Sequence, residues 1–264
     1  MKKKDQEGIR NQVGAQAGNY MSRNVQMGSD TAMESMGELL YKAGKVSNVG
    51  FDQSKGNLFE YIEAAKLQTN MANHGEFFDK NPVTDLPESR GGYGGHTAPD
   101  DFRMQKNGRI VGRGQAKYNN DPERAAKNFV NPKYTDMQRI APVDQMDEIE
   151  ACLDKMVANG EISKSAYENA IRNLQKNGLT SGGTTTAELQ KLRGSDGKIS
   201  QKAVKQYATR FEGRQFAKEI GTTASNMAVA SGVTTAIVSG AQNMFEVFQN
   251  RKSFDEALAD VGGD

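Results

Sequence analysis

The stretch that decides the fold is Thr97–Tyr118, which reads TAPDDFRMQKNGRIVGRGQAKY. Phe102 and Met104 alternate with polar residues, as in a strand that buries one face. Asn107-Gly108 is a pair that two-residue turns favour, and an extended segment returns over residues 110–118. The stretch therefore predicts a β-hairpin.

The two ends of this hairpin carry residues that a hairpin does not need. Asp100 and Asp101 open the first strand, and Gln115-Ala116-Lys117 closes the second. Residues two apart on a strand share a face, so Gln115 and Lys117 project together. Asp101 and Gln115 are nearly equidistant from the turn, and cross-strand neighbours lie within about 5.5 Å. An acid, an amide and an amine are therefore expected to converge.

These groups suit the hydrolysis of a phosphodiester. Mg²⁺ prefers hard oxygen ligands, which the Asp101 carboxylate, the Gln115 side-chain carbonyl and the Ala116 backbone carbonyl would supply. Asp100 is the alternative carboxylate. Lys117 would orient or help deprotonate the attacking water, or stabilise charge on the phosphate. The expected cofactor is Mg²⁺ or Mn²⁺.

The order Pro99-Asp100-Asp101, then Gln115-Ala116-Lys117, resembles the PD-(D/E)XK nuclease superfamily in its Q-x-K variant. The resemblance covers roughly residues 57–118. It implies a metal-dependent endonuclease that acts mostly on DNA, with an acidic residue supplied by a helix before the hairpin. Glu60 and Glu63, in GNLFEYIEAAK, are the candidates for that residue.

The same residues also fit plainer roles. Gln115 and Lys117 could form the solvated face of an ordinary hairpin, and the two aspartates could be turn residues. The formal net charge is +1, so a nucleic-acid site would have to be a local patch. Cations near the hairpin could contact phosphates or only solvate the surface. They are Lys106, Arg109, Arg113 and Lys127.

The rest of the chain is mainly helical in its sequence pattern. Helices are expected over residues 30–43, 57–74, 136–157, 163–176 and 186–220, with Asn57 as a possible cap and Gly75 as a stop. A loop is expected over residues 76–99, where three Pro and four Gly break any period. RGSDGKI, residues 193–199, reads as a turn.

This pattern predicts an α/β (α+β) protein with a small mixed sheet and flanking helices, followed by a mostly helical C-terminal extension. The expected organisation is a flexible N-terminal segment, a nuclease-like α/β core, a helical region and a C-terminal helix rich in small residues. Their bounds are 1–29, 30–135, 136–220 and 221–264.

The C-terminal segment offers a different class of function. No charged residue stands between Glu219 and Glu246, and small residues recur every fourth position from Ala224 to Gly240. Such a ridge allows close helix contact, although Asn226 and the many Ser and Thr make a poor membrane helix. The alternative is therefore a non-enzymatic, toxin-like protein that self-associates, as a homo-oligomer, or contacts a membrane. The chain could also be a fragment.

Two further features of the sequence bear on cysteine chemistry and on cellular location. The single Cys152 excludes an intramolecular disulfide and a cysteine-rich zinc site, and its setting ACLDKM predicts a buried, small apolar role. The start MKKKDQEG lacks the apolar segment of a signal peptide, so a cytoplasmic protein is expected.

Overall fold

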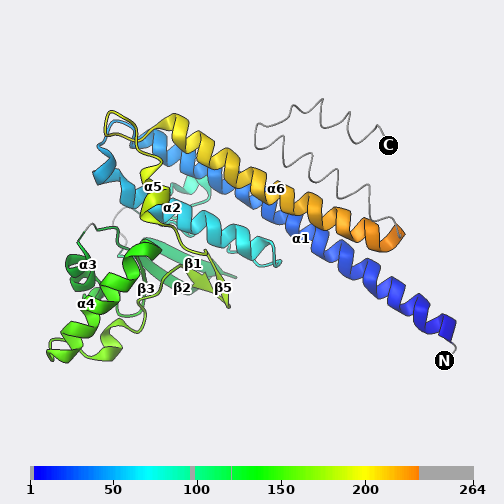
Figure 1. Cartoon of the computed structure of the whole chain (residues 1–264), viewed down its shortest axis with the longest axis horizontal. Helices are drawn as coiled ribbons and strands as arrows, with labels where there is room; N and C mark the ends of the chain where they lie inside the picture. The colour runs from blue at the N-terminus through cyan, green and yellow to red at the C-terminus, as the bar shows by residue number, and fades with distance from the viewer. Residues whose placement is uncertain (1–2, 96–98, 120, 232–264) are drawn as a thin grey trace.

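The computed structural model describes residues 3–95, 99–119 and 121–231 (Figure 1). It contains helices and strands in a mixed order. The helices are α1 (Lys3–Lys45), α2 (Phe51–Ala72), α3 (Pro122–Phe129), α4 (Met146–Ala158), α5 (Thr186–Gln190) and α6 (Gln201–Ser231). The strands are β1 (Phe102–Lys106), β2 (Arg109–Ala116), β3 (Gln138–Ile140), β4 (Gln175–Lys176) and β5 (Leu179–Thr180). Short 3-10 turns are η1 (Glu88–Arg90), η2 (Pro132–Tyr134), η3 (Val143–Gln145) and η4 (Lys164–Tyr167).

The predicted hairpin forms the centre of a small mixed sheet. β1 and β2 are antiparallel, with Phe102 opposite Gly114, and β3 runs parallel to β2 on the other side. Asn107 and Gly108 have φ angles of 52° and 71°, the left-handed conformation that a type I′ turn requires. The expectation of a small mixed sheet with flanking helices is confirmed.

The helices form a layer over this sheet. α1 and α6 lie side by side for much of their length, and α2 lies between this pair and the sheet (Figure 1). Residues 3–29, expected to be flexible, instead form the first part of α1. The sequence does not reveal this because the contact between α1 and α6 joins segments far apart in the chain.

The main hydrophobic core lies between the helical layer and the sheet. It joins α1, α2, β1, β2 and β3 with residues as late as Phe211 in α6. The core therefore includes residues on both sides of position 135, where the sequence analysis expects the α/β core to end. Every residue over 61–65 of α2 is buried. The predicted apolar face of this helix is confirmed, because Leu58, Ile62, Ala65 and Met71 are at most 1% exposed.

A second cluster holds α3 and α4 together. Ala125, Phe129, Ile149 and Leu153 are fully buried in it, and partly buried Cys152 packs against it. Ile140 belongs to the main core whereas the next residue, Ala141, belongs to this cluster. The end of β3 therefore joins the two cores.

Three helix predictions need correction. The segment 136–157 begins as β3 and becomes helical only at Met146, because the backbone of Arg139 pairs with Asn169 and Ile171 at 2.8 and 3.0 Å. The segment 163–176 forms only η4 and β4, and its backbone pairs with neighbouring strands instead.

The third correction concerns residues 186–220. They form α5 and then α6, because the chain reverses between them, where Gly194 N donates to Lys198 O at 2.7 Å. This turn is the one that RGSDGKI predicts.

The two ends of α2 differ in how well the sequence predicts them. The helix begins at Phe51, so Asn57 lies inside it and is not a cap. Its end matches the expectation, since Gly75 has a φ of 72°.

α6 contains the beginning of the uncharged segment. The helix is described as far as Ser231, and the rest of the predicted 221–264 helix lies outside the described residues. Within the described part, no helix combines the length and hydropathy that a bilayer span requires.

Candidate functional site

The opening of the hairpin brings Asp101 against Gln115. The Asp101 backbone N donates to Gly114 O at 2.9 Å, which extends the antiparallel pairing one residue beyond Phe102. Asp101 Oδ2 then accepts hydrogen bonds from Gln115 Nε2 and, at 2.8 Å, from Ala116 N. The Gln115 side chain is largely enclosed, at 3% exposure. The acid and the amide are therefore in direct contact.

Lys117 lies at the same end of the hairpin. Its backbone N donates to Ile140 O at 2.8 Å, so the position after β2 is fixed by β3. Its Nζ lies 5.1 Å from the centroid of the Tyr134 ring. The Lys117 charge also lowers the pKa values of both Asp101 and Glu60, which places the ammonium in the field of both carboxylates.

Glu60 reaches this group from α2. Burial raises its pKa well above the ordinary value of 4.5, and the nearby Asp101 and Asp85 carboxylates raise it further. Burial likewise raises the pKa of Asp101, while Lys117 and the hydrogen bond from Ala116 N oppose the shift. Helix and hairpin thus bring together carboxylates that repel one another, as in many functional sites.

Asp85 is a member of this group that the sequence reasoning did not identify. It lies in the loop between α2 and β1, which is joined to the start of β1 by Thr84 N donating to Asp101 O at 3.0 Å. Asp85 accepts hydrogen bonds from Lys42 Nζ and, at 3.0 Å, from the Tyr61 hydroxyl. The unusual length of the loop over 76–99 was the only signal in the sequence.

Asp100 lies away from this group. Its side chain is fully buried and accepts hydrogen bonds from Arg103 Nη2 at 2.8 Å and Nε at 3.0 Å. Arg113 Nε lies 3.4 Å from the same carboxylate. The Asp100 carboxylate is therefore paired with two guanidinium groups. Of the two aspartates, only Asp101 faces Gln115.

Glu63 also lies elsewhere, although it is less than one helical turn from Glu60. It has no exposed surface and accepts hydrogen bonds from the Ser181 and Thr184 hydroxyls. Leu174 N donates to it at 3.4 Å. Burial raises the Glu63 pKa despite these hydrogen bonds. Glu63 therefore fastens the segment after β5 to α2 and does not reach Asp101.

Most of the cations that were expected to contact phosphates form ion pairs with carboxylates. Lys106 pairs with Glu76, and Lys127 pairs with Glu123 at 2.8 Å. Arg113 is shared between Asp100 and Asp136. Arg109, at the exposed turn, forms no ion pair with the residues that the structure describes.

The donors at this site are those that a hard cation prefers. Glu60 and Asp101 offer carboxylate oxygens, while Gln115 and Ala116 offer neutral carbonyl oxygens. Within the described ranges, no three His, Cys, Asp or Glu side chains form a metal-binding group. The amide of Gln115 would therefore have to act as a ligand. Such a set fits Mg²⁺, which binds one or two carboxylates and keeps several waters.

Comparison with protein-family models, with curated proteins and with solved structures finds no match for this chain.

Proposed function

We propose that this chain is a metal-dependent nuclease of the Q-x-K type, which hydrolyses phosphodiester bonds in DNA with Mg²⁺ or Mn²⁺. The observation that carries the proposal is the convergence of Glu60, Asp101, Gln115 and Lys117 from one helix and both ends of a hairpin. A solvated hairpin face would not need a carboxylate from α2 beside it.

The metal would be held by Glu60, Asp101, the Gln115 amide oxygen and the Ala116 carbonyl. When bound, a divalent cation polarises the phosphate and lowers the pKa of a water molecule that it holds. In the structure, Gln115 donates through Nε2 to Asp101. Rotation of the amide by half a turn exchanges Nε2 for Oε1 without changing the shape of the side chain.

Lys117 would act on the phosphate or on the attacking water. An ammonium group has three N–H donors and no acceptor, so it stabilises developing negative charge and can orient a water oxygen. The Tyr134 ring, 5.1 Å from Nζ, limits the directions in which this side chain can move.

Asp85 and Lys42 would support the site without touching the substrate. The ion pair between them joins the end of α1 to the loop before β1, and Tyr61 donates to the same carboxylate at 3.0 Å. Asp85 raises the pKa of Glu60 whereas Lys42 lowers it. The pair thereby tunes how readily Glu60 loses its proton.

The test is cleavage of plasmid and linear DNA by the full chain with Mg²⁺, with Mn²⁺ and with EDTA. Lys117→Ala should lower the cleavage rate by more than about 100-fold, the cost of removing one well-placed charge-stabilising donor. The circular dichroism spectrum should not change. Lys106→Ala is the matched control, since this lysine lies on β1 and pairs with Glu76.

Two results would contradict the proposal. One is cleavage that survives Lys117→Ala at the parent rate. The other is a parent protein that leaves DNA and RNA intact at every metal concentration while it remains folded.

A further inference from the structure

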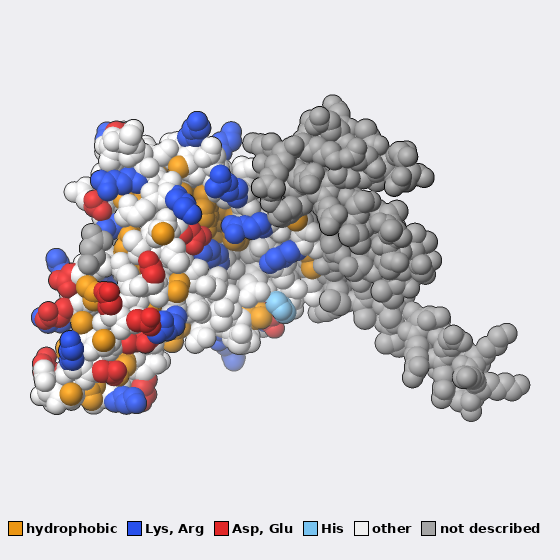
Figure 2. All heavy atoms as spheres, viewed as in Figure 1, with side chains coloured by type: hydrophobic (Ala, Val, Ile, Leu, Met, Phe, Trp, Pro, Cys, Tyr) orange, Lys and Arg blue, Asp and Glu red, His pale blue; other side chains and the backbone are white. Residues whose placement is uncertain are grey.

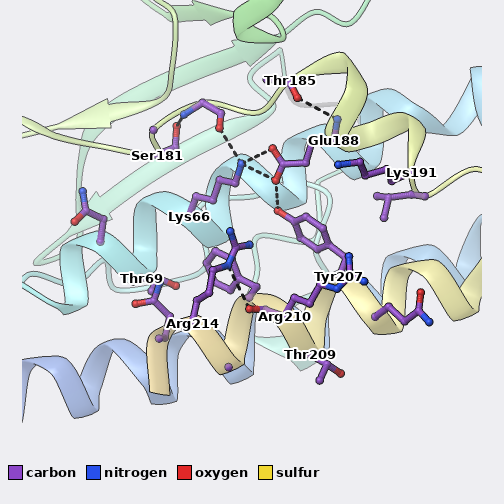
Figure 3. Close-up of a pocket in the computed structure, with 18 of the residues that line it drawn as sticks. Lys66, Thr69, Ser181, Thr185, Glu188, Lys191, Tyr207, Thr209, Arg210 and Arg214 are labelled. Atoms are coloured by element: carbon purple, nitrogen blue, oxygen red, sulfur yellow. Dashed lines mark hydrogen bonds and ion pairs between the residues drawn. The ribbon is translucent and has the colours of Figure 1, made fainter. Parts of the chain in front are cut away.

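A second candidate site lies in a large open cavity between α2, the segment that follows β5, and α6 (Figure 3). Its volume is about 1320 Å³. From α2 and the residue that follows it, the cavity is lined by Lys66, Thr69, Asn70 and Asn73. Successive helical residues turn by about 100°, so these positions lie on a different side of α2 from Glu60. The cavity is therefore separate from the candidate active site.

The acidic group in this cavity is already neutralised. Glu188 is the carboxylate among the described residues that line it, and Lys66 Nζ lies 2.9 Å from its Oε1. The Tyr207 hydroxyl donates to the same carboxylate at 2.7 Å. Figure 3 shows Lys66 and Tyr207 both pointing at Glu188. Lys66 also donates to Gly183 O at 2.8 Å, so its charge is held in place.

The other cations in the lining have no carboxylate partner among the described residues. They are Lys191, Arg210, Arg214 and Lys218. All four are exposed, and none forms an ion pair within the part of the chain that the structure describes. A cavity with these cations and a neutralised acid attracts anions.

The arrangement of these cations is regular along α6. Arg210, Arg214 and Lys218 are four residues apart, so they lie on one side of the helix at intervals of about 6 Å. In Figure 3 the Arg214 side chain rises from α6 toward α2. Figure 2 shows Lys and Arg gathered over α5 and α6, whereas Asp and Glu gather over α3 and α4. Although the net charge of the chain is small, the surface over α5 and α6 is therefore basic.

A buried hydroxyl in the lining also lacks a partner. Thr69 is 1% exposed, and its Oγ1 forms no hydrogen bond in the described structure. Leaving a buried hydroxyl unpaired is unfavourable, so a ligand atom that accepted its hydrogen would remove this cost.

The shape and the side chains of the cavity favour a long ligand that is recognised through phosphate groups. The lining residues of α6 run from Ala203 to Lys218, about 22 Å along the helix. A single nucleotide would fill only part of that length. Phe211 is only 6% exposed, so its ring offers no face on which a base could stack.

We propose that this cavity binds the phosphate backbone of a nucleic-acid strand, through Lys191, Arg210, Arg214 and Lys218. The choice of a nucleic acid as ligand rests on the proposed function. The cavity would hold a part of the substrate that is not being cleaved, because α2 separates it from Glu60 and Asp101. Binding there requires no cleavage and no metal.

The test measures binding alone. The full chain carrying Lys117→Ala is titrated, in EDTA, into a fluorescently labelled 20-nucleotide single strand and into the matching duplex, with anisotropy as the readout. Adding Arg210→Ala and Arg214→Ala should raise the Kd at least tenfold. The slope of log K against log salt should become shallower by about 1.4–1.8, because two phosphate contacts are lost.

The matched control is the pair Lys202→Ala and Lys205→Ala. These exposed lysines lie on α6 outside the cavity lining, so the net charge changes equally. The control should change the Kd less than twofold. Arg210→Lys with Arg214→Lys keeps the charges and should retain most of the affinity, which separates loss of charge from loss of folding.

Three outcomes would overturn the inference. Equal weakening by both double substitutions would mean a diffuse surface charge. Competition by polyglutamate as strong as that by DNA would mean an acidic polypeptide partner, and full displacement by inorganic phosphate at low concentration would mean a small anion. If the cavity variants lose DNA while the parent never cuts it, the inference stands and the nuclease proposal fails.

Discussion

Glu60 and Glu63 are the same residue type on the same helix, yet their surroundings differ. Glu60 faces other carboxylates, and nearby Lys42 and Lys117 offset their repulsion only in part. Glu63 is surrounded by hydroxyl and amide donors. Carboxylates that repel one another, as around Glu60, would be stabilised by a bound cation. A carboxylate surrounded by donors, as at Glu63, is typical of a structural hydrogen-bond network.

Glu60→Gln is expected to stabilise the protein at pH 7 when no metal is bound. A raised pKa in the folded state means that ionised Glu60 destabilises the fold. The stability that protonated Glu60 supplies is complete below its ordinary pKa of 4.5 and is lost as the pH rises through the raised value. The advantage of the variant should therefore vanish toward pH 4.5.

Urea unfolding in EDTA across that pH range measures this difference. A Glu60→Gln protein less stable than its parent at pH 7 would show that the carboxylate is not in a repulsive setting.

Glu63→Ala is expected to destabilise the protein by about 3 kcal/mol. The change leaves the Ser181 and Thr184 hydroxyls and the Leu174 amide without their acceptor in a buried place. Glu63→Gln keeps one acceptor oxygen and should lose less than half as much. Denaturant midpoints would measure both, and an unchanged midpoint for Glu63→Ala would contradict the structural role.

At the scale of elements, the close pairing of β1 and β2 sets the geometry of the candidate site. Gly114 lies opposite Phe102, one residue away from the contact between Asp101 and Gln115. A Cβ at Gly114 would come within 2.9 Å of Phe102 Cδ2 and 3.1 Å of Leu174 Cδ1. Both neighbours are fully buried, so they have little room to move.

Gly114→Ala should therefore cost about 1–3 kcal/mol in the free energy of unfolding and should reduce DNA cleavage. Gly56→Ala is the control, because a Cβ there meets nothing within 4 Å. Alanine inside a helix such as α2 should add about 0.5–1 kcal/mol of stability. Chemical denaturation and cleavage rates measure both effects, and a neutral Gly114→Ala would mean that the sheet adapts freely.

At the scale of the whole molecule, the candidate site joins parts of the chain that fold together. Lys42 comes from α1, Glu60 from α2, Asp85 from the following loop, and Asp101 with Gln115 from the hairpin. A metal bound to this group would hold the helical layer against the sheet. Binding should therefore be visible as global stabilisation.

Mn²⁺ at a hundred times its Kd is expected to raise the melting temperature by about 5 °C, since such binding contributes about 2.7 kcal/mol. Because ligand carboxylates must lose their protons, the increase should shrink as the pH falls toward the raised pKa values of Glu60 and Asp101. Calorimetry of the parent and of Asp101→Asn measures it. An equal increase in the melting temperature of Asp101→Asn would mean that the metal binds at another site.

The sequence determined the features that depend on short-range chemistry. The Asn107-Gly108 turn follows from the backbone freedom of those residues, and the alternation of Phe102 and Met104 follows from the two faces of a strand. They fix the pairing of Lys106 with Arg109 beside the turn, and a one-residue shift of the register between Met104 and Gln105 then brings Asp101 to Gln115. Local spacing therefore predicted the hairpin, whereas the contact at its open end also depends on this irregularity.

Only the tertiary structure decided which of several similar residues join the group. α2 is buried on nearly all sides, so its pattern does not tell Glu60 from Glu63, and the hairpin sequence does not predict the two arginines that pair with Asp100. The strand at 138–140, the role of Asp85 and the basic cavity beside α6 likewise depend on segments distant in the chain. Burial and charge repulsion act between such segments, and local sequence does not encode which of them meet.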